Sequence, residues 1–156
     1  TSITSSLEST CMPTVQESKV EARHLVLPED ASPIETAHGS NVLKWMERAG
    51  TMSAMHFCGG DVVTAGFDSG RFHNPIPQGG IALVDAYVYE VGETSVTQRV
   101  RCFHENHEAG DRTLTSDAKM VSVAVDEDGD PVSVPELQVE TDAGQRLLDE
   151  ARNAER

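Results

Sequence analysis

A glutamate on one predicted helix is the residue of this chain whose type and position best suit acid–base chemistry. Residues 36–56 have the spacing of an amphipathic helix, and Glu47 lies within its line of small and apolar residues. A carboxylate beside an apolar surface can serve as a general base or as a nucleophile. The alternative interpretation is that Glu47 pairs with Lys44 or Arg48 at the solvent edge and takes no part in chemistry.

The start of the same helix is a second candidate site. Its residues are mostly small or polar, and they are Thr36, His38, Gly39, Ser40 and Asn41. Unpaired backbone N–H groups and the helix dipole at such a terminus can stabilise a negatively charged oxygen atom. Simple capping is the alternative interpretation of Gly39 and Ser40, and the residues alone favour it. Because roughly 11–12 Å of helix rise separates Ser40 from Glu47, a site that uses both features needs two facing helices, as in a symmetric antiparallel dimer.

The hydrophobic pattern predicts the elements that position these residues. Residues 18–27 predict a first strand, and alternation with period two predicts four more: Val62–Phe67, Ile81–Val91, Ser95–Phe103 and Thr113–Val125. One long helix and these strands predict an α+β fold, with a curved antiparallel sheet of about five strands wrapped around the helix. We expect a flexible N-terminal arm over residues 1–16, the main domain over 17–141 and a short C-terminal helix over 142–156.

Charge and composition exclude several function classes. Acidic residues number 26 and basic residues 12, for a net charge of −14, which argues against nucleic-acid and anionic membrane partners. Three widely spaced cysteines indicate reduced thiols, and without a recognisable secretion signal we expect a cytoplasmic protein. The excess of acid indicates a salt-accumulating microbe, with an ordinary acidic bacterial protein as the alternative.

No group of residues has convincing metal-ligand spacing. His104 and His107 lack a third ligand nearby in the sequence, and the acidic run at residues 126–130 is better interpreted as a hairpin turn than as a calcium loop. We therefore expect no metal site.

A set of short segments runs in order, without a large gap, from about residue 17 to the end of the chain. They are Val26–Ser32, His38–Ser40, Leu43–Gly50, Val62–Thr64, Phe72–Ile76, Gly79–Gly80, Val91–Ser95, Val123–Pro131 and Val134–Pro135. Together they resemble the acyl-coenzyme A (acyl-CoA) hydrolase branch of the hotdog-fold thioesterases.

The resemblance implies a five-stranded sheet around the long helix, and homodimers, often assembled to hexamers, with sites at the dimer interface. It implies hydrolysis of acyl-CoA to free acid and CoA, without a further cofactor. Glu47 matches the acidic helix residue of the family, which acts as general base or nucleophile, and the amides near Gly39 and Ser40 would form the oxyanion hole. His38 belongs to the same loop and is either a contact of the thioester or structural. Candidate contacts of the CoA phosphates are Thr94, Ser95, Arg112 and Lys119.

The chain departs from the usual family pattern at Ser32, Glu35, Thr36, Ser40 and Glu93. The family usually has Asn in place of Ser32, Gly in place of Glu35 and Asn or Asp in place of Thr36. It usually has a second Gly in place of Ser40 and Arg or Lys in place of Glu93. The Asn or Asp at the Thr36 position is often a catalytic partner. A threonine hydroxyl can position water but cannot act as a base, and Asn41 is the candidate substitute.

These departures favour a second hypothesis, a non-catalytic acyl-CoA-binding or scaffold protein with a degenerate site. A hydratase is a third hypothesis, and it would need an Asp–His pair that the sequence does not show.

Overall fold

The computed structural model describes residues 13–154, without the side chains of residues 69–71. Its strands are β1 (Val20–Leu25), β2 (Val62–Phe72), β3 (Ile81–Val91), β4 (Ser95–Glu105) and β5 (Arg112–Ala124). Its helices are η1 (Pro28–Asp30), α2 (Gly39–Cys58) and α3 (Asp142–Ala154). The strands form one antiparallel sheet in the order β1–β3–β4–β5–β2, which places β1 and β2 at its edges.

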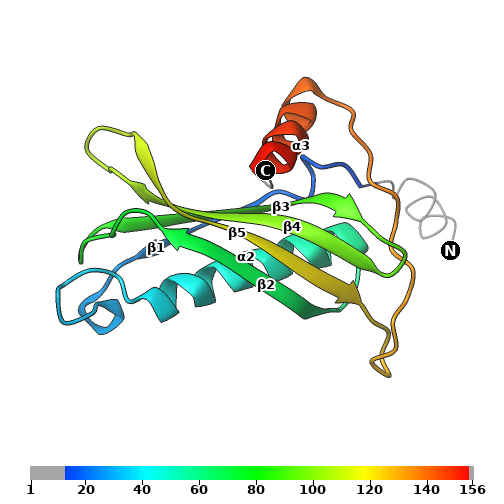
Figure 1. Ribbon diagram of the computed structural model, residues 1–156, viewed down its shortest axis with the longest axis horizontal. Helices are drawn as coiled ribbons and strands as arrows, with labels where there is room; N and C mark the ends of the chain where they lie inside the picture. Colours follow the sequence, from blue (N-terminus) through cyan, green and yellow to red (C-terminus); the bar gives the residue numbers. More distant parts are fainter. Residues whose placement is uncertain (1–12, 155–156) are drawn as a thin grey trace, which may run out of the picture.

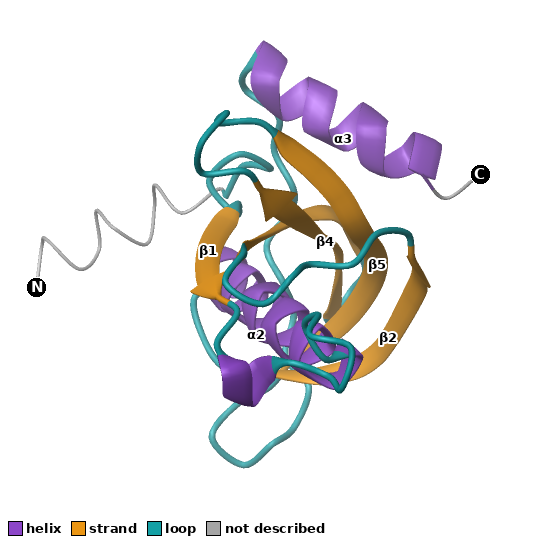
Figure 2. Cartoon of the chain, turned by 90° about the vertical axis from the view of Figure 1, so that its left-hand side faces the viewer, coloured by secondary structure: helices purple, strands orange, loops and turns teal. Residues whose placement is uncertain are grey.

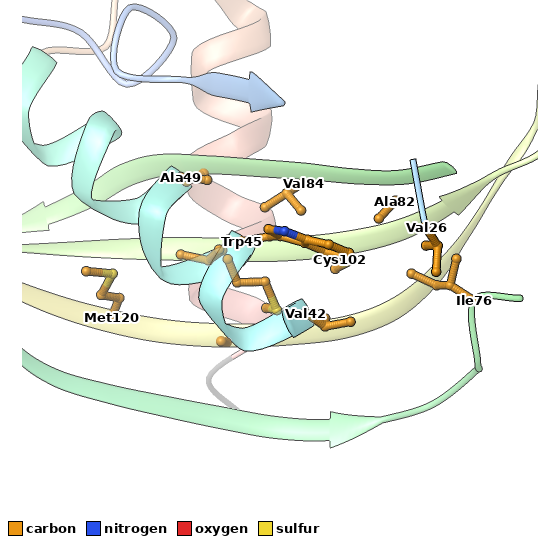
Figure 3. Close-up of a cluster of buried hydrophobic side chains, with 13 residues drawn as sticks. Val26, Val42, Trp45, Ala49, Ile76, Ala82, Val84, Cys102 and Met120 are labelled. Carbon is orange, nitrogen blue, oxygen red and sulfur yellow. The ribbon is translucent and has the colours of Figure 1, made fainter. Parts of the chain in front are cut away.

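The sheet curves around α2, and α3 lies on the opposite face (Figures 1 and 2). The main core lies between α2 and the concave face, where Val42, Trp45, Met46 and Ala49 of α2 meet small and β-branched side chains of β3, β4 and β5 (Figure 3). This arrangement confirms the predicted α+β architecture. No helix in the described part of the chain is long and apolar enough to cross a membrane.

Helix α2 has defined ends and lies close to the sheet. His38, in extended conformation, precedes its first turn, and Gly59 ends it in the left-handed conformation with φ 71°. A Cβ atom at Gly50 would overlap the sulfur of Met120, so the absence of a side chain allows the helix to approach β5. The helix begins three residues later than predicted, because Ala37 instead donates its N–H to the carbonyl of Ile76 at 2.7 Å.

The outer face of the sheet is partly covered by α3 and by the first described residues. Most of the predicted N-terminal arm lies outside the described residues, but its last residues belong to the fold. Thr14 bridges Gln138, and Val15 is fully buried against Tyr87 and Leu148. Val15 therefore packs under α3, although the sequence places it in the arm.

Candidate active site

A cavity of about 420 Å³ opens at the N-terminus of α2. It is lined by Ser32, residues 36–39, Val42, residues 72–76 and Thr115. The segment before α2, the first turn of α2 and the end of β2 with the following loop therefore meet around one space. Val42 and Ile76 are almost fully buried and give the cavity an apolar wall, while hydroxyl, imidazole and carboxamide groups line the rest. Such a mixture suits a ligand with one polar end.

The first turn of α2 presents unpaired N–H groups. The backbone amides of Gly39 and Ser40 have no hydrogen-bond partner among residues 13–154, as expected for the start of a helix. Gly39 lines the cavity, and the ring of Phe72 lies over it, 3.8 Å from where a Cβ would stand. The geometry at Gly39 is therefore suited to hold a negatively charged oxygen.

Two of the predicted residues at this terminus lie outside the cavity wall. Ser40 is exposed, and its hydroxyl is 3.1 Å from Nδ1 of His38. Asn41 donates its side-chain N–H to the carbonyl of Asp30 at 3.2 Å, so it holds η1 against α2. Successive residues on a helix point in directions about 100° apart, which turns these two side chains away from the cavity that Gly39 lines.

Glu47 is half-buried and lies outside the cavity of its own chain. Its Oε1 accepts a hydrogen bond at 2.9 Å from Oγ1 of Thr64 on β2. The ion pairs found in the described residues do not join Glu47 to Lys44 or Arg48. This carboxylate is therefore held by a neutral hydroxyl on the sheet rather than by the neighbouring cations of its helix.

Thr64 is a site residue that the sequence reasoning missed. It lies on the same face of β2 as the partly buried Val62, two residues before it, and its hydroxyl reaches Glu47, which lies 17 residues earlier on α2. A local hydrophobic pattern does not reveal a contact between two elements. Ser32, Phe72 and His73 also line the cavity, although the sequence marked Ser32 only as a departure from a family pattern.

The predicted contacts of the CoA phosphates do not form one group within a chain. Ser95 lies opposite Val123, and Arg112 lies opposite Glu105 at the other end of the 11-residue strand β4. That strand length separates them by about 33 Å. The antiparallel register places the turns at the two ends of β4 at opposite ends of the sheet, and the role of these residues as contacts of the CoA phosphates stays a prediction.

The remaining predicted contacts also lie apart. Thr94 belongs to the turn beside Ser95, and Lys119 pairs across the strands with Arg99, in the middle of β5. The Arg112 guanidinium lies over the ring of Phe103 at 4.3 Å.

The acidic run at residues 126–130 forms the predicted turn. Oδ1 of Asp126 accepts the N–H groups of Asp128 and Asp130, both at 2.9 Å. The three exposed carboxylates are close enough to share a cation, as exposed acidic turns often are, but the hydrogen bonds and the bridge between Val125 and Pro131 already account for the turn.

Comparison with known proteins identifies the family. Residues 35–110 match the thioesterase superfamily. The chain is 32% identical over 127 residues to the uncharacterized acyl-CoA thioester hydrolase YkhA of Bacillus subtilis, covering 81% of this chain and 74% of that protein. The family match spans α2, β2, β3 and β4.

Solved structures agree with this similarity. The acyl-CoA hydrolase of Staphylococcus aureus, in complex with butyryl-CoA, CoA and CoA disulfide, has a TM-score of 0.83 at 27% identity and covers 91% of this chain and 87% of its own. Structures of this enzyme with an aspartate, an asparagine or a threonine replaced by alanine also match. An apo-hexameric acyl-CoA thioesterase has a TM-score of 0.82 at 31% identity, with 92% of both chains covered. The chain therefore has the hotdog fold and belongs to the acyl-CoA hydrolase family of the thioesterase superfamily.

Proposed function

We propose that this protein hydrolyses acyl-CoA to a free acid and CoA, at a site shared by two copies of the chain in the cytoplasm. The observation that carries the proposal is the cavity at the N-terminus of α2, where an unpaired amide, an apolar wall and polar side chains meet. The acid group needed for hydrolysis lies two turns along the same helix, outside this cavity. Two antiparallel copies of α2 would bring each cavity to the acid of the other copy.

The chemistry then follows from these groups. The thioester carbonyl oxygen accepts a hydrogen bond from the amide of Gly39, which stabilises the negative charge that develops as water attacks the carbonyl carbon. Glu47 of the partner subunit takes the proton of that water, and the tetrahedral intermediate expels the thiolate of CoA as the C–S bond breaks. The same carboxyl group returns its proton to the thiolate, so the acid and CoA leave with the carboxylate restored. In a nucleophilic variant of this route, the carboxylate itself attacks and water cleaves the resulting anhydride.

The spacing of the replaced residues in the Staphylococcus aureus enzyme supports the roles of Glu47 and Thr64. In that enzyme the aspartate and the threonine are 17 residues apart, as Glu47 and Thr64 are here. The asparagine precedes the aspartate by fifteen residues, and the same step back from Glu47 reaches Ser32. A relative studied as an acyl-CoA hydrolase therefore has polar groups at the spacings of the three groups that surround the proposed reaction.

The surface around Glu47 supports the shared site. Met52 and Met55 on α2 are 41% and 43% exposed in a single chain, and β2, whose Thr64 contacts Glu47, is an edge strand of the sheet. An apolar surface beside an unpaired strand edge favours contact with another chain. A second copy on this face would place two α2 helices side by side, and a hexameric thioesterase of the same fold is consistent with further assembly.

Release of free thiol from acyl-CoA esters of short, medium and long chains, measured in low salt and in about molar KCl, tests this function. Glu47→Gln should lower kcat by about 100-fold or more, while light scattering shows the same assembly. Glu90→Gln, at an exposed glutamate on β3, is the matched control and should keep full activity. Full turnover by the Glu47 variant would contradict its role.

The alternative of a non-catalytic acyl-CoA-binding protein is favoured by one observation. Hydroxyl side chains stand at Ser32 and Thr36, so a carboxamide or carboxylate is missing from this part of the cavity wall. Calorimetric binding of an acyl-CoA with no thiol release by the wild-type protein would support this alternative and contradict the proposed enzyme.

A further inference from the structure

Two hydroxyl groups face each other in the wall of the cavity. Oγ of Ser32 and Oγ1 of Thr36 are 3.3 Å apart, and either can be the donor. Both residues are half-buried and both line the cavity. Each hydroxyl has one proton and two lone pairs, so their mutual hydrogen bond leaves one proton and several lone pairs for a third group.

The backbone fixes this pair. Ser32 donates its N–H to the carbonyl of Thr36 at 2.7 Å, and Glu35 donates its N–H to the carbonyl of Ser32 at 2.9 Å. Glu35 closes this tight turn with φ 62°, and its own carbonyl accepts the N–H of Gln78 at 2.9 Å. These backbone bonds close the turn without help from the two hydroxyls, so the side chains of Ser32 and Thr36 remain available to the cavity.

We propose that Ser32 and Thr36 act as one positioning group that holds the attacking water in the cavity. This inference rests on the proposed thioesterase function. A primary carboxamide presents one donor group and one acceptor in a fixed plane, and two hydroxyls in mutual contact also present a donor and an acceptor a fixed distance apart. The pair therefore takes the place of the asparagine that the Staphylococcus aureus enzyme has at the spacing of Ser32.

The proton balance assigns the pair a positioning role only. An uncharged serine or threonine hydroxyl does not keep a proton taken from water at neutral pH. The water held by Ser32 and Thr36 therefore passes its proton to Glu47 of the partner subunit as its oxygen attacks the carbonyl carbon. The hydroxyls orient the lone pair of that water, and a water misplaced by about 1 Å would slow the reaction by on the order of 100-fold.

Removing either hydroxyl tests the pair as a unit. Ser32→Ala and Thr36→Val should each lower kcat by about 10- to 100-fold, with KM for acyl-CoA within about twofold. The double variant should be little worse than either single variant, because groups that act as a unit are strongly non-additive. Thr36→Ser keeps a hydroxyl and should retain most of the activity. Thr113→Val, at an exposed threonine near the start of β5, is the matched control.

A rescue experiment separates positioning from loop stability. Ser32→Asn combined with Thr36→Ala supplies a carboxamide and no hydroxyl, and it should recover kcat relative to Ser32→Ala combined with Thr36→Ala. Thermal unfolding of every variant reports whether the turn has been damaged. Two results would contradict the proposal that Ser32 and Thr36 act as one group: an unchanged kcat in both single variants, or a loss of kcat in the double variant equal to the product of the two single losses. Neither result would contradict the thioesterase function. Absence of hydrolysis by the wild-type protein would overturn that function and the pair with it.

Discussion

At the scale of single residues, the proposed reaction depends most on the carboxylate of Glu47, whose two oxygens differ in their hydrogen bonding. Oε1 of Glu47 is held by Thr64, while Oε2 has no hydrogen-bond partner within residues 13–154. One oxygen is thus oriented by the chain and the other is free to receive a proton. The hydroxyl fixes the direction in which that free oxygen points, so the reaction should be sensitive to Thr64 as well as to Glu47 itself.

Thr64→Val should therefore lower kcat/KM by on the order of 10- to 100-fold, since it leaves the carboxylate without its orienting hydrogen bond. Steady-state thiol release measures the effect. Thr64→Ser keeps the donor and should stay close to wild type. Equal activity of the Val and Ser variants would show that the hydrogen bond does not matter. Because Thr64 is exposed on an edge strand, the melting temperature should change little in either variant.

Glu35 supplies a stability prediction at the same scale. It is the non-glycine residue with positive φ in the described part of the chain, at 62°, and a side chain in that conformation costs roughly 1 kcal/mol. Glu35→Gly should raise the free energy of unfolding by somewhat less than that, because glycine gains freedom in the unfolded chain. Glu35→Ala removes the same charge but keeps the Cβ, so it should bring no comparable gain in chemical denaturation. Equal free energies of unfolding for Glu35→Gly and Glu35→Ala would show that the backbone at Glu35 is not strained.

At the element scale, α2 lies against the sheet over most of its length and is also held by β1. The imidazole of His24 on β1 stacks on the indole of Trp45, with ring centroids 4.8 Å apart and planes within 4°. Trp45 is buried among the residues of the main core (Figure 3). The edge strand is thus attached to the helix that carries Glu47 by a contact that depends on the protonation of His24.

Burial lowers the pKa of His24 below its usual value, and the positive charge of Arg48 adds to this effect, while Asp30 opposes it. A lowered pKa in the folded state means that stability from the neutral ring is complete above the unfolded pKa of about 6.5. It is lost as pH falls through the lower folded value. Unfolding by urea at several pH values should show this decrease below about pH 6.5, and His24→Phe, which keeps a stacked ring, should reduce it. An unchanged slope in the variant would assign the pH dependence to other groups.

The sequence predicts the elements well where hydrophobic alternation is regular and poorly where it is interrupted. The range Ile81–Val91 is predicted to the residue because β3 is an interior strand and is buried over most of its length. Strand β2 continues past Phe67 to Phe72, but register shifts near Thr64 and after Ser69 break its alternation. For the site, the sequence marks Thr36, His38 and Gly39 as candidates; the structure places all three in the wall of one cavity, and their catalytic roles stay predictions. The contact of Thr64 with Glu47 joins two elements whose residues are 17 positions apart, which a local pattern does not contain.

At the scale of the whole molecule, the excess of acidic residues opposes both the folding of one chain and the association of several copies. The net charge of −14 on 156 residues repels both segments of one chain and copies of the chain. The visible ion pairs of the described residues use several of the scarce cations, including Arg101 with the buried Asp85 at 2.7 Å. Dissolved salt would screen the repulsion among the remaining carboxylates.

The melting temperature should rise by about 5–10 °C between about 0.1 M and about 2 M KCl, as the Debye length falls to a few ångströms. Differential scanning fluorimetry measures it, and sucrose at matched osmolality controls for exclusion from the surface. A melting temperature that does not increase with KCl would favour the ordinary acidic bacterial protein over adaptation to salt.

Co-expression of two inactive chains tests most directly whether the site is shared between copies. Glu47→Gln removes the acid, and Gly39→Pro removes the amide at a position where the extended His38 and the start of α2 tolerate proline. Each variant alone should lose about 100-fold in activity. Mixed dimers, purified through two different tags, should recover about half of the wild-type activity, because one of their two sites takes an intact amide from one chain and an intact acid from the other. Mixed dimers that remain as inactive as the single variants would show that each chain uses its own Glu47, and would contradict the shared site.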